Sequence, residues 1–340
     1  MLKASAYPTH KLMCTYSNRN NMKCLSYTFR YACFIAIMLL AAPYALKAQE
    51  PAADTSYWSN TAEGTLTFSQ VSLSNWAGGG NNSIALNMYA GFVANYAKDR
   101  VSWENSLNLG YGLVNQSNTG LQKSDDKINL ISKFGYQLSQ ESNKLFWSSM
   151  VDLKTQFAQG FDLPNDSIEI SRFAAPAYIL VTTGLDYKPS SNFSIMYSPV
   201  TGKLTLVTSQ ALADQGAFGV DPAEFDELGN LVAEGKQFRA EIGTYIKMNY
   251  KREIFTDVNY QTNLELFSNY LDEFGNIDVN WENTFIMKVN KFLSANLITQ
   301  LIYDDDIKTT EVLNDGTMVQ RGARVQFKQI FGLGLSYIIK

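Results

Sequence analysis

The 340-residue sequence contains one histidine and three cysteines, and all four lie near its start, at His10, Cys14, Cys24 and Cys33. Long hydrophobic runs are also scarce. One stretch, residues 31–46, approaches the ~20 apolar residues that a membrane-spanning helix needs. The chain is therefore not a helical membrane protein with several spans. With 46% hydrophobic and 18% charged residues, it also differs from a disordered chain, which would be less apolar and more charged.

The apolar stretch is predicted to belong to a secretory signal peptide. Basic residues precede it and the small residue Ala48 closes it, which gives the charged, apolar and small-residue regions of such a signal. Cleavage after Ala48 would make Gln49 the first mature residue, so residues 1–48 are the predicted signal, with Met22 as an alternative start. An N-terminal membrane anchor is disfavoured because Pro43 interrupts the short run.

Removal of residues 1–48 would leave a chain without cysteine or histidine. Disulfides, thiolate or imidazole metal sites, and Ser–His or Cys–His nucleophile pairs are then excluded. Six of the 28 Lys and Arg residues and none of the 32 Asp and Glu residues would be lost, so the mature net charge is −10. An acidic chain is a poor candidate for binding nucleic acid, which requires basic surfaces. We expect no enzyme, no metal site and no cofactor; a lipid-active enzyme that uses only carboxylates is the weakest functional alternative.

What the sequence does contain is alternation with a period of two. In residues 101–113, apolar side chains such as Trp103 and Leu107 alternate with polar ones such as Ser102 and Glu104. This pattern is typical of strands with one apolar and one polar face. Such runs are predicted near residues 64–73, 83–97, 101–115, 127–139, 144–158, 176–188, 193–207, 237–251, 255–269, 277–289, 293–304 and 323–339.

The lengths of the joins predict how the strands are arranged. Joins after even-numbered strands are tight, whereas most of those after odd-numbered strands are long: 116–126, 159–175, 208–236, 270–276 and 305–322. Short turns at one end, long loops at the other and an even strand count are typical of an outer-membrane barrel. We therefore predict an all-β fold, a single antiparallel transmembrane β-barrel of 12 strands over residues 60–340, after a short polar lead at 49–59. A soluble β-sandwich would not sort its loops in this way.

The polar faces of the predicted strands are the candidate lining of a lumen. If the apolar faces contact lipid, charged residues of both signs point inward: Glu104, Lys133, Asp152, Lys154, Arg239, Glu241, Lys247, Asp257, Glu265, Glu282, Lys288, Arg324 and Lys328. These charges either tune the selectivity of a narrow water-filled pore or pair across strands and seal the barrel. Pairing of Arg239, Lys247 and Lys288 with carboxylates would favour the sealed barrel.

Three stretches have distinctive compositions: NWAGGGNNS at 75–83, YSPVTGKLTLV at 197–207 and ALADQGAFGVD at 211–221. Their candidate loop-motif residues are Trp76, Gly78, Gly79, Pro199, Gly202, Asp214 and Asp221. Pro199 cannot donate a hydrogen bond to a neighbouring strand, so it predicts a break or bulge in the seventh strand. Together the stretches resemble the outer-membrane barrel family of Bacteroidetes-type bacteria described as domain of unknown function 3078. The resemblance implies a fold and a location for most of the mature chain, and no activity.

The leading functional hypothesis is a passive channel or small-solute transporter in the bacterial outer membrane, reached by export with a cleaved signal. Lumen residues of mixed sign would set its selectivity, and the loop at 208–236 would narrow its mouth. The alternative is a non-conducting structural or partner-binding barrel that works through its long extracellular loops. The expected partners are outer-membrane lipid and small solutes or ions, with no nucleic acid; the sequence names no protein partner.

Overall fold

The computed structural model describes residues 56–72, 81–117, 119–161, 168–272, 274–312 and 318–339. Two units are distinguished, Met1–Ser56 and Tyr57–Lys340, and all the described residues except Ser56 belong to the second. The predicted signal peptide and its junction at Ala48 and Gln49 therefore lie outside the described residues, as does most of the lead at 49–59. In the described part of the chain, no helix combines the length and the hydrophobicity needed to span a membrane.

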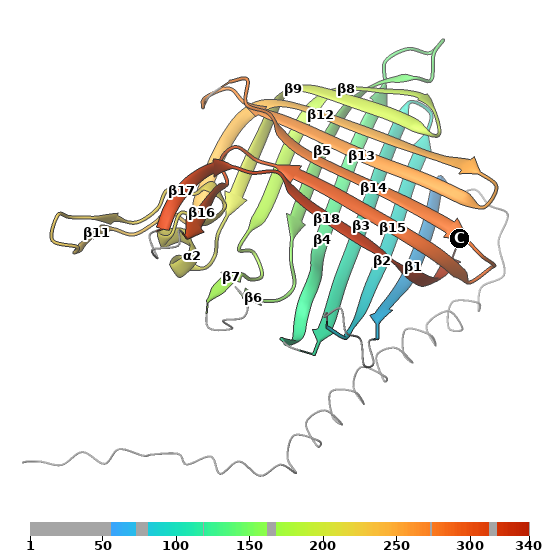
Figure 1. Ribbon diagram of the computed structural model, residues 1–340. Coiled ribbons are helices and arrows are strands. Elements are labelled where there is room, and N and C mark those ends of the chain that lie inside the picture. The colour runs from blue at the N-terminus through green and yellow to red at the C-terminus, as the bar shows by residue number, and fades with distance from the viewer. Residues whose placement is uncertain are drawn as a thin grey trace, which may run out of the picture. The chain divides into compact units, whose positions relative to one another are not determined.

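Antiparallel strands close into a barrel (Figure 1). In chain order its twelve strands are β1 (Trp58–Val71), β2 (Ser83–Lys98), β3 (Val101–Gln116), β4 (Gly120–Gln137), β5 (Leu145–Thr155), β8 (Ala177–Ser190), β9 (Phe193–Leu206), β12 (Phe238–Phe255), β13 (Val258–Asn269), β14 (Asp278–Lys288), β15 (Leu293–Tyr303) and β18 (Gln326–Ile339). Around the ring the order is β1-β18-β15-β14-β13-β12-β9-β8-β5-β4-β3-β2, and pairing of β1 with β18 closes it. Each strand matches one of the predicted runs, so the predicted all-β barrel is confirmed.

The outward face of the strands is apolar and the inward face is polar. Along β2, Ile84, Leu86, Met88 and Phe92 are exposed, whereas Asn87 between them is buried. Exposed apolar and buried polar side chains reverse the usual arrangement of a water-soluble protein, and they are the arrangement expected of strands surrounded by lipid. The fold is therefore that of a transmembrane β-barrel.

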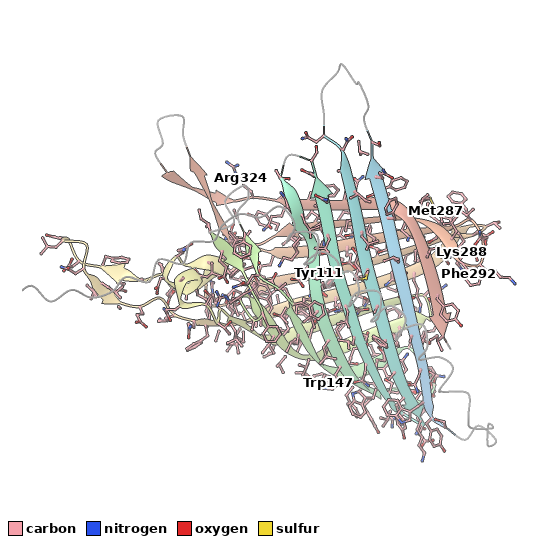
Figure 2. The ribbon with its side chains drawn as sticks, turned by 90° about the horizontal axis from the view of Figure 1, so that it is seen from below. Tyr111, Trp147, Met287, Lys288, Phe292 and Arg324 are labelled. Carbon is pink, nitrogen blue, oxygen red and sulfur yellow. The ribbon has the colours of Figure 1, made fainter. Side chains whose placement is uncertain are left out.

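Aromatic side chains gather where the strands end at short turns. The ring of Trp58 on β1 lies 5.3 Å from that of Tyr96 on β2 and 5.9 Å from that of Trp103 on β3. Trp103 Nε1 donates a hydrogen bond to Ser132 Oγ at 2.9 Å, so its polar edge is satisfied. Trp147 on β5 lies on the outer surface as well (Figure 2). These rings form an aromatic girdle of the kind that membrane barrels place at the lipid–water interface.

The long joins carry short elements at the opposite end of the barrel. Between β5 and β8 lie β6 (Gly160–Phe161) and β7 (Glu169–Ser171). The join at 207–237 contains α2 (Gln210–Asp214), the 3-10 turn η1 (Ala217–Gly219), β10 (Glu224–Phe225) and β11 (Leu231–Ala233). β16 (Lys308–Val312) pairs with β17 (Met318–Ala323) before β18 begins. The β10–β11 hairpin extends away from the barrel (Figure 1).

The prediction of a long loop at 116–126 was wrong. The β3–β4 ladder continues to the pairing of Gln116 with Gly120, so the join is a tight turn. Gly120 has a φ of +75°, a conformation that glycine adopts readily. The alternation of apolar and polar residues stops earlier than the ladder does, because a strand that extends beyond lipid does not need an apolar outer face.

The predicted break at Pro199 is a β-bulge in β9. The register against β12 shifts between the pairs Gly243–Thr201 and Tyr245–Ser198. Side-chain hydroxyls bind two of the carbonyl groups at the bulge: Thr244 Oγ1 donates to the Ser198 carbonyl at 3.0 Å, and Tyr270 Oη donates to the Pro199 carbonyl at 2.7 Å. A bulge that leaves backbone groups unpaired in lipid would be costly, so these hydroxyls make it tolerable.

Candidate functional site: the lumen

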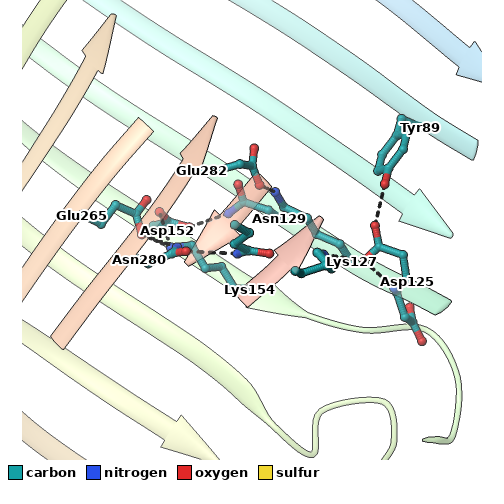
Figure 3. Close-up of polar contacts among 12 residues, drawn as sticks. Tyr89, Asp125, Lys127, Asn129, Asp152, Lys154, Glu265, Asn280 and Glu282 are labelled. Atoms are coloured by element: carbon teal, nitrogen blue, oxygen red, sulfur yellow. Dashed lines mark hydrogen bonds and ion pairs between the residues drawn. The ribbon is translucent and has the colours of Figure 1, made fainter. Parts of the chain in front are cut away.

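An ion pair crosses the middle of the lumen. Lys127 Nζ on β4 lies 2.8 Å from Glu282 Oε2 on β14. In the closed ring of twelve strands, β4 and β14 are six positions apart in either direction, so the two side chains come from opposite walls. The lumen is therefore bridged at this level (Figure 3).

A second group of charges lies beside this bridge and is more deeply buried. Lys247 Nζ on β12 lies 2.8 Å from Glu265 Oε1 and 3.1 Å from Asp152 Oδ2. Lys154 forms an ion pair with Glu265, and Asn129 Nδ2 donates to Asp152 Oδ1 at 2.6 Å (Figure 3). Each buried carboxylate thus has a cationic partner, which is the condition for burying charge without a large penalty.

A third group lies toward the short-turn end. Lys133 Nζ lies 2.8 Å from Asp186 Oδ2 and 3.0 Å from Glu104 Oε2. Lys188 forms ion pairs with the same two carboxylates. Asp186 and Lys188 are not among the predicted lumen residues, although the alternation along β8 places both on its inward face.

The mouth at the long-loop end carries an excess of negative charge. Two cations, Lys203 and Arg239, lie among five carboxylates. Lys203 Nζ lies 2.7 Å from a carboxylate oxygen of Asp278, 3.5 Å from one of Glu241 and 3.6 Å from one of Asp304. Arg239 Nη2 lies 2.9 Å from a carboxylate oxygen of Asp306, 3.4 Å from one of Asp272 and 3.6 Å from one of Glu241. Among the described residues, no group of three or more carboxylates is arranged to hold a metal ion. The excess of acids makes the mouth more favourable for cations than for anions.

The loop at 207–237 folds over part of this mouth. Its apolar residues Val207, Leu212, Ala213 and Val220 are buried together with Ala175, which lies before β8. The predicted loop residues hold it in shape: Asp214 Oδ1 accepts from the Gly235 N–H at 2.8 Å, and Asp221 pairs with Lys236 at 2.7 Å. Arg239 Nη1 donates to the carbonyl of Gly219 at 3.0 Å, and a Cβ on Gly219 would lie 3.1 Å from that of Asp306. The loop therefore reaches from β12 toward the end of β15.

The interior is not filled evenly. On the side formed by β5, β8, β9, β12 and β13, an apolar cluster is buried next to the ion pairs: Met150, Leu180, Met196, Tyr245 and Phe267. Asp152 on this side has no exposed surface. On the other side, the side chains of Lys127, Glu282 and Lys328 are 33%, 25% and 38% exposed. Glycines occupy inward positions there, at Gly91, Gly110, Gly112, Gly332 and Gly334. One half of the lumen is packed with apolar side chains; in the other half, polar side chains pack closely over the glycines, and water reaches the charges of Lys127, Glu282 and Lys328.

Three predicted lumen residues lie elsewhere. Asp257 is in the exposed turn between β12 and β13, with a φ of +62°. Lys288 is exposed at the short-turn end of β14, and Arg324 is exposed between β17 and β18 at the opposite end (Figure 2). For Asp257 and Arg324 the alternation was extended past the end of a strand, whereas Lys288 is the last residue of β14 and is exposed because the strand ends there. Pairing of Arg239, Lys247 and Lys288 with carboxylates was expected to distinguish a sealed barrel from an open one. Arg239 and Lys247 have carboxylate partners, and Lys288 has none among the described residues. Trp76, Gly78 and Gly79 lie outside the described residues.

Residues 68–161 match the model of the family described as "Protein of unknown function (DUF3078)". The resemblance predicted from the sequence is thus confirmed over this segment, which includes the first of the three distinctive stretches and ends before the other two. No curated protein shows significant similarity to the chain.

Solved structures with similar folds include an outer membrane channel from Pseudomonas putida F1, with 14% identity and a TM-score of 0.35 over 85% of this chain and 99% of that one. The translocator domain of the autotransporter NalP from Neisseria meningitidis has 7% identity and a TM-score of 0.32, covering 91% and 97%. A FadL homologue from Pseudomonas aeruginosa has 9% identity and a TM-score of 0.28, covering 82% and 90%. Similarity at this level does not indicate what this chain binds or transports.

Proposed function

We propose that the protein is an outer-membrane channel for small polar solutes, narrowed by ion pairs that cross its lumen. The long loops would face the exterior and the short turns the periplasm, as in bacterial barrels of this kind. The observation that carries the proposal is the uneven interior. In the half that holds the half-buried pair of Lys127 and Glu282, the lining is polar and water reaches both charges, whereas the half around Tyr245 is closed by buried apolar side chains.

The ion pairs of the two halves would behave differently. Breaking a pair whose members already contact water costs little, because water replaces the lost partner. Lys127 and Glu282 form such a pair, so thermal motion can separate them and widen the path between β4 and β14. Asp152 is fully buried, and separating it from Lys247 would leave an uncompensated charge. We therefore expect solutes to pass along the side of the lumen that is formed by β14, β15, β18, β1, β2 and β3.

A sealed barrel that works through its loops is the second candidate. The apolar cluster around Met150 and Tyr245, together with the partners of Lys247 and Arg239, favours it. In that case the ion pairs would serve only to satisfy buried charges. The two candidates differ in whether any solute crosses.

Solute flux into liposomes separates them. The mature protein would be refolded, checked by its heat-dependent shift in gel mobility, and reconstituted for swelling assays with neutral solutes of increasing size. We expect swelling with the smallest solutes and a steep decline with size, because the path is narrow. Liposomes without protein and liposomes with heat-unfolded protein are the controls. Swelling no faster than in these controls would overturn the channel proposal and leave the sealed barrel.

A further inference from the structure

A pocket of about 380 Å³ opens at the long-loop end, between β4 and the β6–β7 hairpin. It is lined by residues 121–126 of β4, by Gln156 and Gln159, and by Gly160, Phe161, Ile170 and Ser171 of the hairpin. Its volume is within the range of small-molecule sites, which begins at about 300 Å³. Gly160 allows a close approach to both neighbours: a Cβ there would lie 2.5 Å from Ser171 Oγ across the hairpin and 3.4 Å from Lys123 Nζ of β4.

The charged groups in the lining neutralise one another. Lys123 Nζ lies 2.9 Å from Asp126 Oδ2 and donates to Gln156 Oε1 at 3.3 Å and to the Ala158 carbonyl at 2.8 Å, which uses all three of its protons. Asp125 Oδ1 lies 2.9 Å from Lys328 Nζ. No charge in the lining is left without its counter-charge, so the pocket does not favour a charged ligand.

Polar groups with unused hydrogen-bonding capacity also line the pocket. Within the described part of the chain, the side chains of Gln122 and Ser171 have no hydrogen-bond partner, although both reach the pocket. An amide and a hydroxyl each both donate and accept, which suits hydroxyl groups on a ligand. The rim is apolar: Leu121, Phe161 and Ile170 are 69%, 37% and 49% exposed. The pocket thus combines neutral hydrogen-bonding groups with an exposed aromatic ring.

We propose that this pocket binds a neutral saccharide. The hydroxyl groups of the sugar would bind Gln122 and Ser171, and its C–H face would pack on the ring of Phe161, whose π face is electron-rich. A charged sugar would gain no partner, because the lysine and the carboxylates are already paired. The site does not depend on conduction through the lumen.

The pocket also adjoins the accessible half of the lumen. Asp125 lines the pocket, yet its carboxylate accepts from Tyr89 Oη at 2.7 Å and from Lys328 Nζ at 2.9 Å inside the barrel (Figure 3). A bound saccharide would therefore lie beside an ion pair at the entrance of the proposed path. If the protein is a channel, this is a place where a solute can be held before it enters.

Binding of maltose to the refolded protein tests the proposal. Saturation-transfer NMR and calorimetry would be performed in a detergent without a sugar head group, with glucuronate, glucosamine and uridine as comparison ligands. Phe161→Ala should weaken maltose binding about tenfold, the equivalent of one aromatic contact. Phe225→Ala on the β10–β11 hairpin is the control, because it removes an exposed phenylalanine from another short loop strand that does not line the pocket. Gln122→Ala should weaken binding as well.

Maltose binding that Phe161→Ala and Gln122→Ala reduce, and that Phe225→Ala leaves unchanged, supports the proposal. Tighter binding of glucuronate or glucosamine than of maltose would overturn the neutral ligand class. Binding of uridine without maltose would overturn the saccharide, and so would the absence of maltose binding by a folded barrel. Maltose binding by a protein that passes no solute would overturn the channel and leave the pocket standing.

Discussion

Lys127 and Glu282 stand on opposite walls of a twelve-strand ring, and their charged groups meet at 2.8 Å. Barrels of eight strands are filled by side chains and those of sixteen hold an aqueous channel, so a ring of twelve does not decide between the two. Here the contact from wall to wall excludes a wide pore at this level. The proposed path is therefore narrow and lies on one side of a packed interior.

The buried charges are expected to be essential for stability. Glu265→Gln would leave Lys154 and Lys247 without a shared carboxylate inside the barrel, so the free energy of unfolding should fall by about 3–5 kcal/mol. Urea unfolding followed by gel mobility measures this. Lys236→Gln, which breaks an exposed loop pair, is the control and should leave the midpoint unchanged. Equal effects of the two substitutions would show that the buried pairs do not stabilise the barrel.

The bulge at Pro199 is predicted to require a glycine on the neighbouring strand. A Cβ on Gly184 would lie 2.1 Å from the carbonyl oxygen of Tyr197, which is backbone and cannot move aside freely. Gly184→Ala should therefore destabilise the barrel by about 1–3 kcal/mol, measured by urea unfolding. Gly202→Ala, on β9 itself, meets nothing within 4 Å and should be neutral. A neutral Gly184→Ala would mean that the bulge adjusts without strain.

The β10–β11 turn is expected to loosen in acid. Asp226 Oδ1 accepts from the N–H groups of Leu228 and Asn230 at 2.9 and 2.7 Å, and Asn230 Nδ2 donates to Oδ2 at 3.0 Å. These bonds, chiefly that from the Asn230 side chain, lower the pKa of Asp226 below its ordinary value. Its contribution to turn stability is therefore complete above the ordinary aspartate pKa of about 3.9 and is lost as the pH falls through the lowered pKa.

The NMR signal of the Asn230 amide, followed during acid titration, checks this prediction. It should remain unchanged until the pH is below the ordinary aspartate value and then move. Asp226→Asn, which keeps an accepting oxygen but cannot titrate, should remove the transition. A transition at or above the ordinary value would show that the hydrogen bonds do not favour the carboxylate.

Much of the fold could be predicted from the sequence, because lipid on one side and polar side chains on the other impose alternation on every strand. The lumen was harder to predict. Alternation placed Glu104 and Lys133 on inward faces, but the contact of Lys127 with Glu282 depends on which strands face each other once the ring has closed. Asp257 was wrongly placed in the lumen because the alternation of apolar and polar residues does not show where a strand begins or ends. The neutrality of the pocket beside Gln122 depends on contacts between β4 and the loop hairpin that local sequence does not specify.

Single-channel conductance in planar bilayers shows whether the Lys127–Glu282 pair limits passage through the lumen. Wild-type protein should show small, steady conductance. Lys127→Glu, which sets two carboxylates against each other, should increase it by repulsion, and so should Glu282→Lys. The double exchange restores an ion pair with reversed polarity and should return the conductance toward the wild-type level. If the folded wild type and all three variants show no conductance, the protein is not a channel; if the single reversals leave an existing conductance unchanged, the Lys127–Glu282 pair does not limit passage.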